Sequence, residues 1–401
     1  MDHFKLRKDD RITSSVSSFG LAIGLKPTGK HSAITDCCWS STGKYVVLGE
    51  GSILKIWERT LQGSPSFKHL RFRGHSKKIT SVAFSSACDV ALSVGEDCTV
   101  RVWRPSILGK SAWFKIHSAR INHIEMASNG TDFLSCSDDK TIKLYRLSHA
   151  DEAIATVTFV TSFKGHSNWV RCVKFSPDGK LVYSVGDEGL FRIWELASGR
   201  LLHSFARAKG DCKYFDLSPS GLFIAAGVGA EVLVYDTRNC LLKDSLTLPG
   251  PVGRIQWHES GVFMTVACSD TIRFVSFANN HLSVDLRVQT PDALTALQFG
   301  PGDMLATGDV TGQLALWQFR YRPVEEEPPS PVADAEDMSV AVPPMEIRDG
   351  VVRVAVKSQE TLPDQLSQSI TALEKGVKGM VGMLRVLESR VGAIEDTLAC
   401  S

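Results

Sequence analysis

A unit of three short strands recurs along the chain and restricts its fold more than any other feature. The clearest copy, residues 166–194, reads HSNWVRCVKFSPDGKLVYSVGDEGLFRIW and has three apolar runs at period two, separated by the turn sequences SPDG and GDEG. Residues 75–103 and 117–145 have the same length, open with His-Ser and close on an aromatic residue. Three short strands cannot bury their apolar face alone, so these units must pack against one another.

The closing position of the unit can be followed through the whole first part of the chain. It falls at Trp57, Trp103, Tyr145, Trp194, Tyr235, Val275 and Trp317. A period near 40 to 45 residues, with Gly-His at the start of the unit, resembles the WD40 family, in which each repeat supplies the four strands of a propeller blade. We therefore predict an all-β, seven-bladed WD40 β-propeller over residues 15–320, with the count of blades five to seven depending on patterning alone.

The resemblance implies a hydrogen-bonded set of side chains inside each blade, made of the opening His, a strand hydroxyl, the hairpin Asp and the closing Trp. The positions that match are His75, Ser93, Asp97 and Trp103 in blade two, His117 and Asp139 in blade three, and His166 and Trp194 in blade four. Blade three closes on Tyr145, and blade four has Glu188 in place of the Asp. A buried imidazole needs partners for both nitrogens, so we interpret these histidines as structural groups.

Composition and motifs favour a cytosolic binding protein over an enzyme. The formal net charge of +1 gives no overall signal for nucleic acid or membrane, and ten scattered cysteines without CxxC or zinc spacing indicate reduced thiols. The longest apolar run, residues 222–230, is too short to span a bilayer, and the N-terminus lacks a secretory signal. No phosphate loop, nucleophile elbow or metal-spaced set occurs, so we expect no enzymatic activity, no metal and no cofactor.

The remaining segments divide the chain into further parts. Residues 1–14 are expected to be disordered, and residues 16–25 to supply the strand that closes the last blade, because an unclosed propeller leaves a raw sheet edge. An insertion near residues 149–154 lengthens the connection to the outer strand of blade three. Residues 321–361 form an acidic, proline-containing linker, and residues 351–356 within it have the composition of a short strand.

Residues 362–401 carry the pattern of a coiled coil. Ten apolar positions alternate steps of four and three: Leu366, Ile370, Leu373, Val377, Met380, Leu384, Leu387, Val391, Ile394 and Leu398. The order of β-branched residues and leucines favours a parallel homodimer, with a trimer as the alternative. Four glycines weaken the helix, so we infer that it forms with a partner; the other interpretation is a helix that folds back on the propeller.

The residue before each inner strand is expected to lie on the face around the central channel. These residues are Ala33, Lys78, Arg120, Trp169, Asp211, Pro251 and Ala293. Together with Lys77, Arg171 and Lys213, they predict a basic patch centred on Trp169 in blades two to four, which has the composition of an interface for an acidic partner. The alternative is an ordinary solvated rim with Trp169 folded against the neighbouring blade.

The arrangement of propeller, acidic linker and terminal coiled coil resembles the proteome-of-centriole protein one family, the WD-repeat proteins of centrioles and basal bodies. The stretches that carry the resemblance are HSNWVRCVKFSPDGKLVYS at residues 166–184, DDKTIKLY at residues 138–145, and the placement of residues 362–398. It implies a structural protein of the cytoskeleton that binds tubulin in the triplet-microtubule wall, meets other centriolar proteins and dimerises through its coiled coil.

Two other functions are compatible with a propeller followed by a helix. Tyr235-Asp236-Thr237-Arg238 is a degenerate match to the Trp-Asp-x-Arg ending of substrate receptors for cullin ubiquitin ligases. A regulatory subunit of a microtubule-severing or intraflagellar transport complex has the same layout. Co-purification of a cullin adaptor, or of a stoichiometric enzymatic partner, distinguishes these from a centriolar scaffold.

Overall fold

The computed structural model describes residues 16–25, 32–59, 67–106, 111–148, 156–206, 212–321, 347–348 and 351–352. The chain divides into two compact units, Met1–Glu325 and Glu326–Ser401. Residues 1–14, the insertion at 149–154, Asp211, most of the linker and all of the coiled-coil seam lie outside the described residues. The expectations placed on those segments therefore remain predictions.

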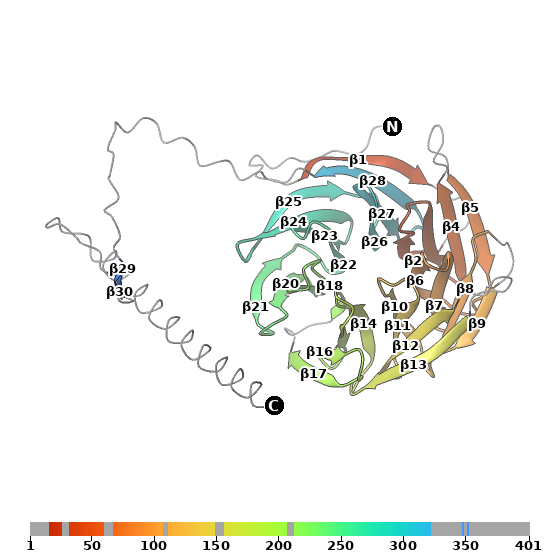
Figure 1. Cartoon of the computed structure of the whole chain (residues 1–401). Helices are drawn as coiled ribbons and strands as arrows, with labels where there is room; N and C mark the ends of the chain where they lie inside the picture. Colours follow the sequence, from red (N-terminus) through yellow and green to blue (C-terminus); the bar gives the residue numbers. More distant parts are fainter. Residues whose placement is uncertain are drawn as a thin grey trace, which may run out of the picture. The chain divides into compact units, whose positions relative to one another are not determined.

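Seven antiparallel four-stranded sheets form a ring of blades around one axis (Figure 1). Blade one has β2 (Ile34–Trp39), β3 (Tyr45–Glu50), β4 (Ile53–Arg59) and β5 (Phe67–Arg73); blade two has β6 (Ile79–Ser85), β7 (Val90–Gly95), β8 (Thr99–Trp103) and β9 (Ser111–Lys115); blade three has β10 (Ile121–Met126), β11 (Asp132–Ser137), β12 (Thr141–Ser148) and β13 (Thr156–Lys164). Blade four has β14 (Val170–Phe175), β15 (Leu181–Gly186), β16 (Leu190–Glu195) and β17 (Leu201–Ala206); blade five has β18 (Cys212–Leu217), β19 (Phe223–Val228), β20 (Glu231–Asp236) and β21 (Leu242–Thr247). Blade six has β22 (Val252–Trp257), β23 (Phe263–Cys268), β24 (Thr271–Ala278) and β25 (His281–Gln289), and blade seven has β26 (Leu294–Gly300), β27 (Met304–Asp309) and β28 (Leu314–Tyr321). The predicted count of seven is confirmed.

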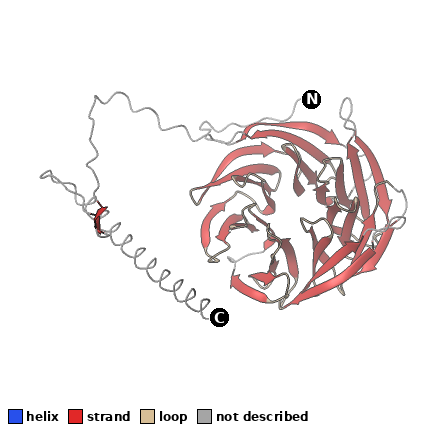
Figure 2. Cartoon of the chain, in the orientation of Figure 1, coloured by secondary structure: helices blue, strands red, loops and turns tan. Residues whose placement is uncertain are grey.

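The N-terminal strand closes the ring, as predicted. β1 (Val16–Leu25) pairs antiparallel with β28 and is the fourth strand of blade seven. The register runs from Val16 opposite Tyr321 to Leu25 opposite Leu314. Blade seven is thus built from both ends of the propeller sequence, and β1 lies beside β28 in Figure 1. Figure 2 shows that the described elements of the propeller are strands joined by loops and turns.

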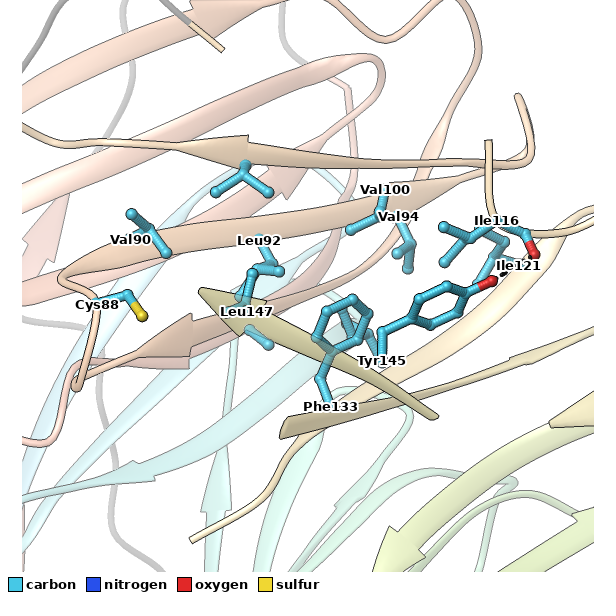
Figure 3. Packing of buried hydrophobic residues seen from close by; sticks show 13 residues of the cluster. Cys88, Val90, Leu92, Val94, Val100, Ile116, Ile121, Phe133, Tyr145 and Leu147 are labelled. Carbon is cyan, nitrogen blue, oxygen red and sulfur yellow. Dashed lines mark hydrogen bonds between the residues drawn. The ribbon is translucent and has the colours of Figure 1, made fainter. Parts of the chain in front are cut away.

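The hydrophobic core lies between neighbouring blades. One cluster combines Phe133, Tyr145 and Leu147 of blade three with Leu92 and other residues of blade two (Figure 3). An equivalent cluster joins blade one to blade seven. Because each blade packs on both faces, the second strands β7 and β23 are buried along their whole length, and apart from Ser93 and Thr265 they are built from apolar residues and glycine.

The turn between the second and third strand differs in length between blades, from two residues, 51–52, in blade one to four residues, 310–313, in blade seven. In blades two, three and four it covers residues 96–98, 138–140 and 187–189, whereas in blades five and six it covers only residues 229–230 and 269–270. Gly229 and Ser269 begin these short turns with φ of 58° and 52°, the left-handed conformation that a two-residue hairpin requires. Blade five has no Asp in this turn, whereas the turn of blade six contains Asp270, whose carboxylate accepts from Gln289 Nε2 over 2.7 Å.

Two features differ from the sequence prediction in extent. The extra residues of blade three go partly into longer strands, β12 and β13, and not only into the connection between them. β28 continues to Tyr321, inside the segment assigned to the linker. In the second unit, β29 (Ile347–Arg348) and β30 (Val351–Val352) pair as a two-stranded hairpin, so part of the segment expected to form a strand does so.

Candidate protein-interaction face

Blade two contains a continuous chain of hydrogen bonds from its closing aromatic residue to its hairpin. The indole Nε1 of Trp103 donates to Ser93 Oγ over 2.8 Å, and Ser93 Oγ lies 2.7 Å from His75 Nε2. His75 Nδ1 lies 2.8 Å from Asp97 Oδ2. Since the carboxylate can only accept, Nδ1 carries the proton and Nε2 accepts from the serine hydroxyl. These bonds tie β7 and β8 to the loop before β6, which holds His75, and to the turn at residues 96–98.

The electrostatics of this set are those of a structural network. Burial lowers the pKa of His75, His117 and His166, against the opposing effect of the neighbouring carboxylates. Burial alone would raise the pKa of Asp97, but hydrogen bonds from Thr99 and His75 outweigh it and hold that pKa below its usual value. Each imidazole is neutral and is bonded through both ring nitrogens, to a carboxylate of the hairpin and to a strand serine, so these histidines hold the hairpin in place.

Blade four keeps the same network with a longer carboxylate. His166 Nδ1 bonds Glu188, and its Nε2 lies 2.8 Å from Ser184 Oγ, which also accepts from Trp194 Nε1 over 2.9 Å. Arg192 Nε lies 3.5 Å from Glu188 and neutralises the carboxylate. Glutamate therefore replaces aspartate at this hairpin without loss of the set.

Blade three uses a different ending (Figure 3). The hydroxyl of Tyr145 donates to the backbone oxygen of Ile116 over 3.0 Å and does not reach Ser135, whose Oγ lies 2.9 Å from His117 Nε2. The ring stacks on Phe133 with centroids 5.5 Å apart. Burial raises the pKa of Tyr145 to about 12, so the phenol stays neutral. Tyrosine thus ties its strand to the backbone before the His, whereas tryptophan ties it to the serine.

Blade seven contains a bond of this kind that the sequence analysis missed. Trp317 Nε1 donates to Thr307 Oγ1 over 2.8 Å, the geometry of Trp103 and Ser93, although no His opens the blade. Asp309 in its hairpin accepts from the backbone of Thr311 and Gln313, each over 2.9 Å. The signal was the hydroxyl residue ten positions before the closing Trp, which blades two and four share.

Three of the predicted face residues occupy equivalent positions in successive blades. The backbone oxygens of Lys78, Arg120 and Trp169 each accept a 2.9 Å hydrogen bond from the first residue of the hairpin turn in the same blade. This shared geometry places the three residues on one face, at the start of the inner strands. We call Lys77, Lys78, Arg120, Trp169, Arg171 and Lys213 the channel rim.

Trp169 is the exposed aromatic residue of the channel rim. Its side chain is 46% exposed, and the guanidinium of Arg171 lies 4.9 Å from the ring centroid. Arg171 is itself held by Asp187, with Nε 2.8 Å from Oδ1, and lies 3.6 Å from Asp138 of blade three. Trp169 therefore stacks on an anchored cation of its own blade and stays open to a partner; it does not fold against the neighbouring blade.

Carboxylates lie beside the cations of the predicted basic patch. Arg120 lies 3.5 Å from Glu96, and Arg171 pairs with two aspartates, so both guanidiniums are matched by carboxylates from hairpin turns. Lys77, Lys78 and Lys213 are exposed, and no carboxylate among the described residues lies within 4.0 Å of their Nζ atoms. The rim is thus a mixed-charge centre with lysines as its unpaired cations.

Across the described ranges there is no group of three His, Cys, Asp or Glu side chains placed to hold a metal ion, and no helix long and apolar enough to cross a membrane. The nine cysteines in these ranges are free thiols, and seven of them are buried. Burial raises the pKa of Cys172 to about 12, which makes it a packing residue and not a nucleophile.

Comparison with known protein families identifies the repeats that form blades one to four. The family model described as WD domain, G-beta repeat matches residues 25–58, 67–104, 110–146 and 157–195. Blades one to four are WD40 repeats, set in a ring of seven blades. The four matches fall on blades one to four, which include the three blades with the complete His and carboxylate set. Blades five to seven are four-stranded sheets of the same ring.

Curated relatives of this WD40 propeller have diverse names. The chain is 28% identical over 253 residues to pre-mRNA-processing factor 19 homolog 2 of Arabidopsis thaliana, covering 61% of this chain and 47% of that protein. It is 22% identical over 269 residues to the serine-threonine kinase receptor-associated protein of Dictyostelium discoideum, covering 64% and 88%. It is 32% identical over 161 residues to nuclear distribution protein nudF of Aspergillus terreus, covering 39% and 33%. The chain thus spans about half the length of the Arabidopsis relative.

Proposed function

We propose that this WD40 propeller is a non-enzymatic docking scaffold whose channel rim binds another protein. The observation that carries the proposal is Trp169, an exposed aromatic residue fixed over the anchored guanidinium of Arg171. Rigid aromatic and arginine side chains dominate the binding energy of protein interfaces, and their ordering before binding reduces the entropic cost. WD40 propellers generally mediate protein–protein interactions, which agrees with this use of the rim.

The partner proposed for the rim is the wall of triplet microtubules in centrioles or basal bodies. Support comes from the resemblance of residues 166–184 and 138–145 to centriolar WD-repeat proteins, and from the three unpaired lysines. Lysines around a central aromatic group suit an acidic protein surface such as that of tubulin, because charge complementarity steers and orients the encounter. The proposed location is the cytoskeleton of the cytoplasm.

Pairing of two chains through residues 362–401 completes the proposal. Two linked propellers on one filament raise the effective concentration of the second contact, so a weak rim contact gives firm attachment. The lattice of a microtubule offers the repeated sites that this arrangement needs. The coiled coil therefore serves assembly, and the channel rim serves recognition.

Binding to microtubules tests the proposal directly. Full-length protein carrying Lys78→Ala, Arg120→Ala and Trp169→Ala is compared with wild type in co-sedimentation with polymerised tubulin. We expect binding of the wild type and at least a tenfold loss for the triple variant. The matched control is Lys180→Ala, Arg200→Ala and Leu222→Ala, which removes two cations and an exposed apolar side chain from turns at the opposite ends of the strands. Equal binding by all three proteins excludes the rim.

A receptor for a cullin ubiquitin ligase is the second candidate, and one observation favours it. Arg238 of the Tyr235-Asp236-Thr237-Arg238 ending has a side chain 65% exposed, held by Asp236 at 2.8 Å. An anchored, exposed arginine is suited to contact an adaptor. Co-purification of a cullin adaptor that Arg238→Ala abolishes supports this candidate, whereas co-purification of a stoichiometric enzyme supports a severing or transport subunit.

A further inference from the structure

The axis of the propeller contains a polar cavity of about 230 Å³. All seven inner strands contribute to its walls, because alternate residues of each strand point toward the axis. The third and fifth residues of these strands include Asp36, His123, Glu125, Lys174 and Arg254. Apolar residues would be the simplest filling for such a space, so this concentration of charged groups requires an explanation.

One side of the cavity is organised by Arg254 of β22. Its Nη2 lies 3.0 Å from Asp36 of β2 and donates to the backbone oxygen of Thr35 over 2.9 Å, while its Nε donates to Thr295 over 3.2 Å. The guanidinium lies 3.7 Å from the ring centroid of Tyr214. Its Nη1 donates to no acceptor within the described part of the chain. Arg254 is thus rigidly held with one amino group available.

Asp36 has no capacity left for a ligand. Its Oδ2 accepts from Ser81 Oγ over 2.7 Å and from the backbone of Val82 over 3.0 Å, and its Oδ1 accepts from Cys37. With Arg254 added, both oxygens are saturated. Any further anionic contact to Arg254 must come from outside the protein.

Negative charge is in excess around Lys174. Lys174 Nζ lies 3.2 Å from Glu125 and 3.3 Å from Asp216, so two carboxylates share one ammonium group. Lys174 is the one cation that pairs with Glu125 among the residues described. Burial raises the pKa of Glu125, the expected result for a carboxylate with too little compensation.

The imidazole of His123 lies in the wall of the same cavity and is affected by the charges of both Lys174 and Arg254. Its side chain is buried and lines the cavity, and its Nδ1 has no hydrogen-bond partner among the residues that the structure describes. Burial, followed by the charges of Lys174 and Arg254, holds the pKa of His123 well below its usual value. The ring is therefore neutral. It forms a hydrogen bond with the backbone of Val173, and Nδ1 is the ring nitrogen that still needs a partner.

We propose that the axial cavity binds a small zwitterion of the amino-acid class, with its carboxylate on Arg254 Nη1 and its ammonium group on Glu125. His123 Nδ1 contacts the polar atoms between the two ends. A lone anion would meet the surplus carboxylates, and a lone cation would meet Arg254 and Lys174. A zwitterion satisfies both ends of the cavity. Its ammonium group places a positive charge beside Glu125, so negative and positive charges alternate from Asp216 through Lys174 and Glu125 to the ligand.

The size of the cavity is consistent with this ligand. At roughly 30 Å³ per water molecule, about 230 Å³ corresponds to about seven or eight waters, which is enough room for a small amino acid such as glycine or alanine. Water alone can also satisfy His123, so ordered water is the outcome against which the proposal is tested. Each charged contact made in such a site favours binding by tenfold or more.

Isothermal titration calorimetry of the full chain tests the site, with L-alanine and glycine as probes and acetate and methylammonium as half-ligands. We expect saturable binding of an amino acid and at least tenfold weaker binding of each half-ligand. Glu125→Gln keeps the shape of the side chain and should lower the affinity for the amino acid at least tenfold. The matched surface change Glu259→Gln should leave this affinity unchanged.

Circular dichroism of each variant establishes that the propeller is folded. Absence of saturable heat from either amino acid with folded wild type, or unaltered affinity in folded Glu125→Gln, overturns the proposal and assigns the cavity to water. Binding of peptides without binding of free amino acids overturns it as well. None of these results depends on the channel rim or its partner.

Discussion

The indole of Trp103 and the hydroxyl of Ser93 are joined by a 2.8 Å hydrogen bond that also positions His75. Trp194 with Ser184 and Trp317 with Thr307 repeat this bond at 2.9 Å and 2.8 Å. A single buried hydroxyl therefore serves two ring systems in blades two and four. The loop that carries the channel rim is fixed through this shared atom.

Ser93→Ala should destabilise the propeller strongly. It leaves Trp103 Nε1 and His75 Nε2 buried without partners, and each unsatisfied group costs about 1–3 kcal/mol, so the free energy of unfolding should fall by about 2–5 kcal/mol. Urea unfolding monitored by tryptophan fluorescence measures this loss. Ser86→Ala removes an exposed hydroxyl that bonds Ser41 and should change the stability by less than about 0.5 kcal/mol. Equal midpoints for the two variants would contradict the role of Ser93.

Tyr145→Phe should cost about 1 kcal/mol of unfolding free energy, because one hydrogen bond is lost while the ring keeps its packing on Phe133. Ile116 retains its bond from Lys143 Nζ at 2.7 Å, so its oxygen is not left bare. Equilibrium urea unfolding measures the difference from wild type. A loss above about 3 kcal/mol would show that the hydroxyl has a further partner.

Stability should fall as the pH is lowered from 7.5 to 5.5. Burial lowers the pKa of His75, His117 and His166 in the folded state, so below the unfolded pKa near 6.5 the unfolded chain binds more protons than the folded one. Each such histidine contributes a slope of up to about 1.4 kcal/mol per pH unit. Asp97, whose folded pKa is depressed, adds a second loss only below about pH 3.8. Urea unfolding at pH 7.5, 6.5 and 5.5 checks the first window.

Two variants separate the buried histidines from the exposed ones in this experiment. His117→Asn should flatten the dependence on pH, even though it lowers stability at every pH. His203→Asn, at an exposed position, should leave the slope unchanged. A wild-type stability that is constant or that rises toward pH 5.5 would contradict the assignment of neutral buried imidazoles.

The sequence was sufficient for the features that repeat within one blade. Strand periodicity, turn residues and the spacing of His75, Ser93, Asp97 and Trp103 all act over one unit, so each copy supports the next. The closing strand at residues 16–25 followed from the need to avoid an open edge. Local rules of this kind predicted seven blades even where blades five and six have shorter hairpins.

Contacts between blades could not be read in the same way. Asp36 and Arg254 are distant in the sequence and meet only because the ring closes, and Arg171 pairs with Asp138 of the neighbouring blade. Periodicity indicates that such residues face the axis or the rim, but not which partner each finds. The pairing of Arg120 and Arg171 with acidic residues could therefore not be foreseen from the sequence, and the use of the channel rim in binding stays a prediction.

The coiled-coil prediction concerns residues outside the described ranges and is tested by mass in solution. We expect the full chain to be a dimer by size-exclusion chromatography with light scattering. Leu373→Lys with Leu387→Lys places charges at two seam positions and should give a monomer, because buried charges in the seam are not compensated. Glu388→Lys lies off the seam and should remain dimeric. A monomeric wild type would contradict pairing through this segment.

The localisation of tagged full-length protein in ciliated cells tests the central claim most directly. We predict that wild type labels centrioles or basal bodies and that the variant with Lys78→Ala, Arg120→Ala and Trp169→Ala, expressed at an equal level, does not. The variant with Lys180→Ala, Arg200→Ala and Leu222→Ala should label them normally. Normal labelling by the rim variant, or absence of wild type from these structures, would contradict the proposal that the channel rim attaches this propeller to the centriole.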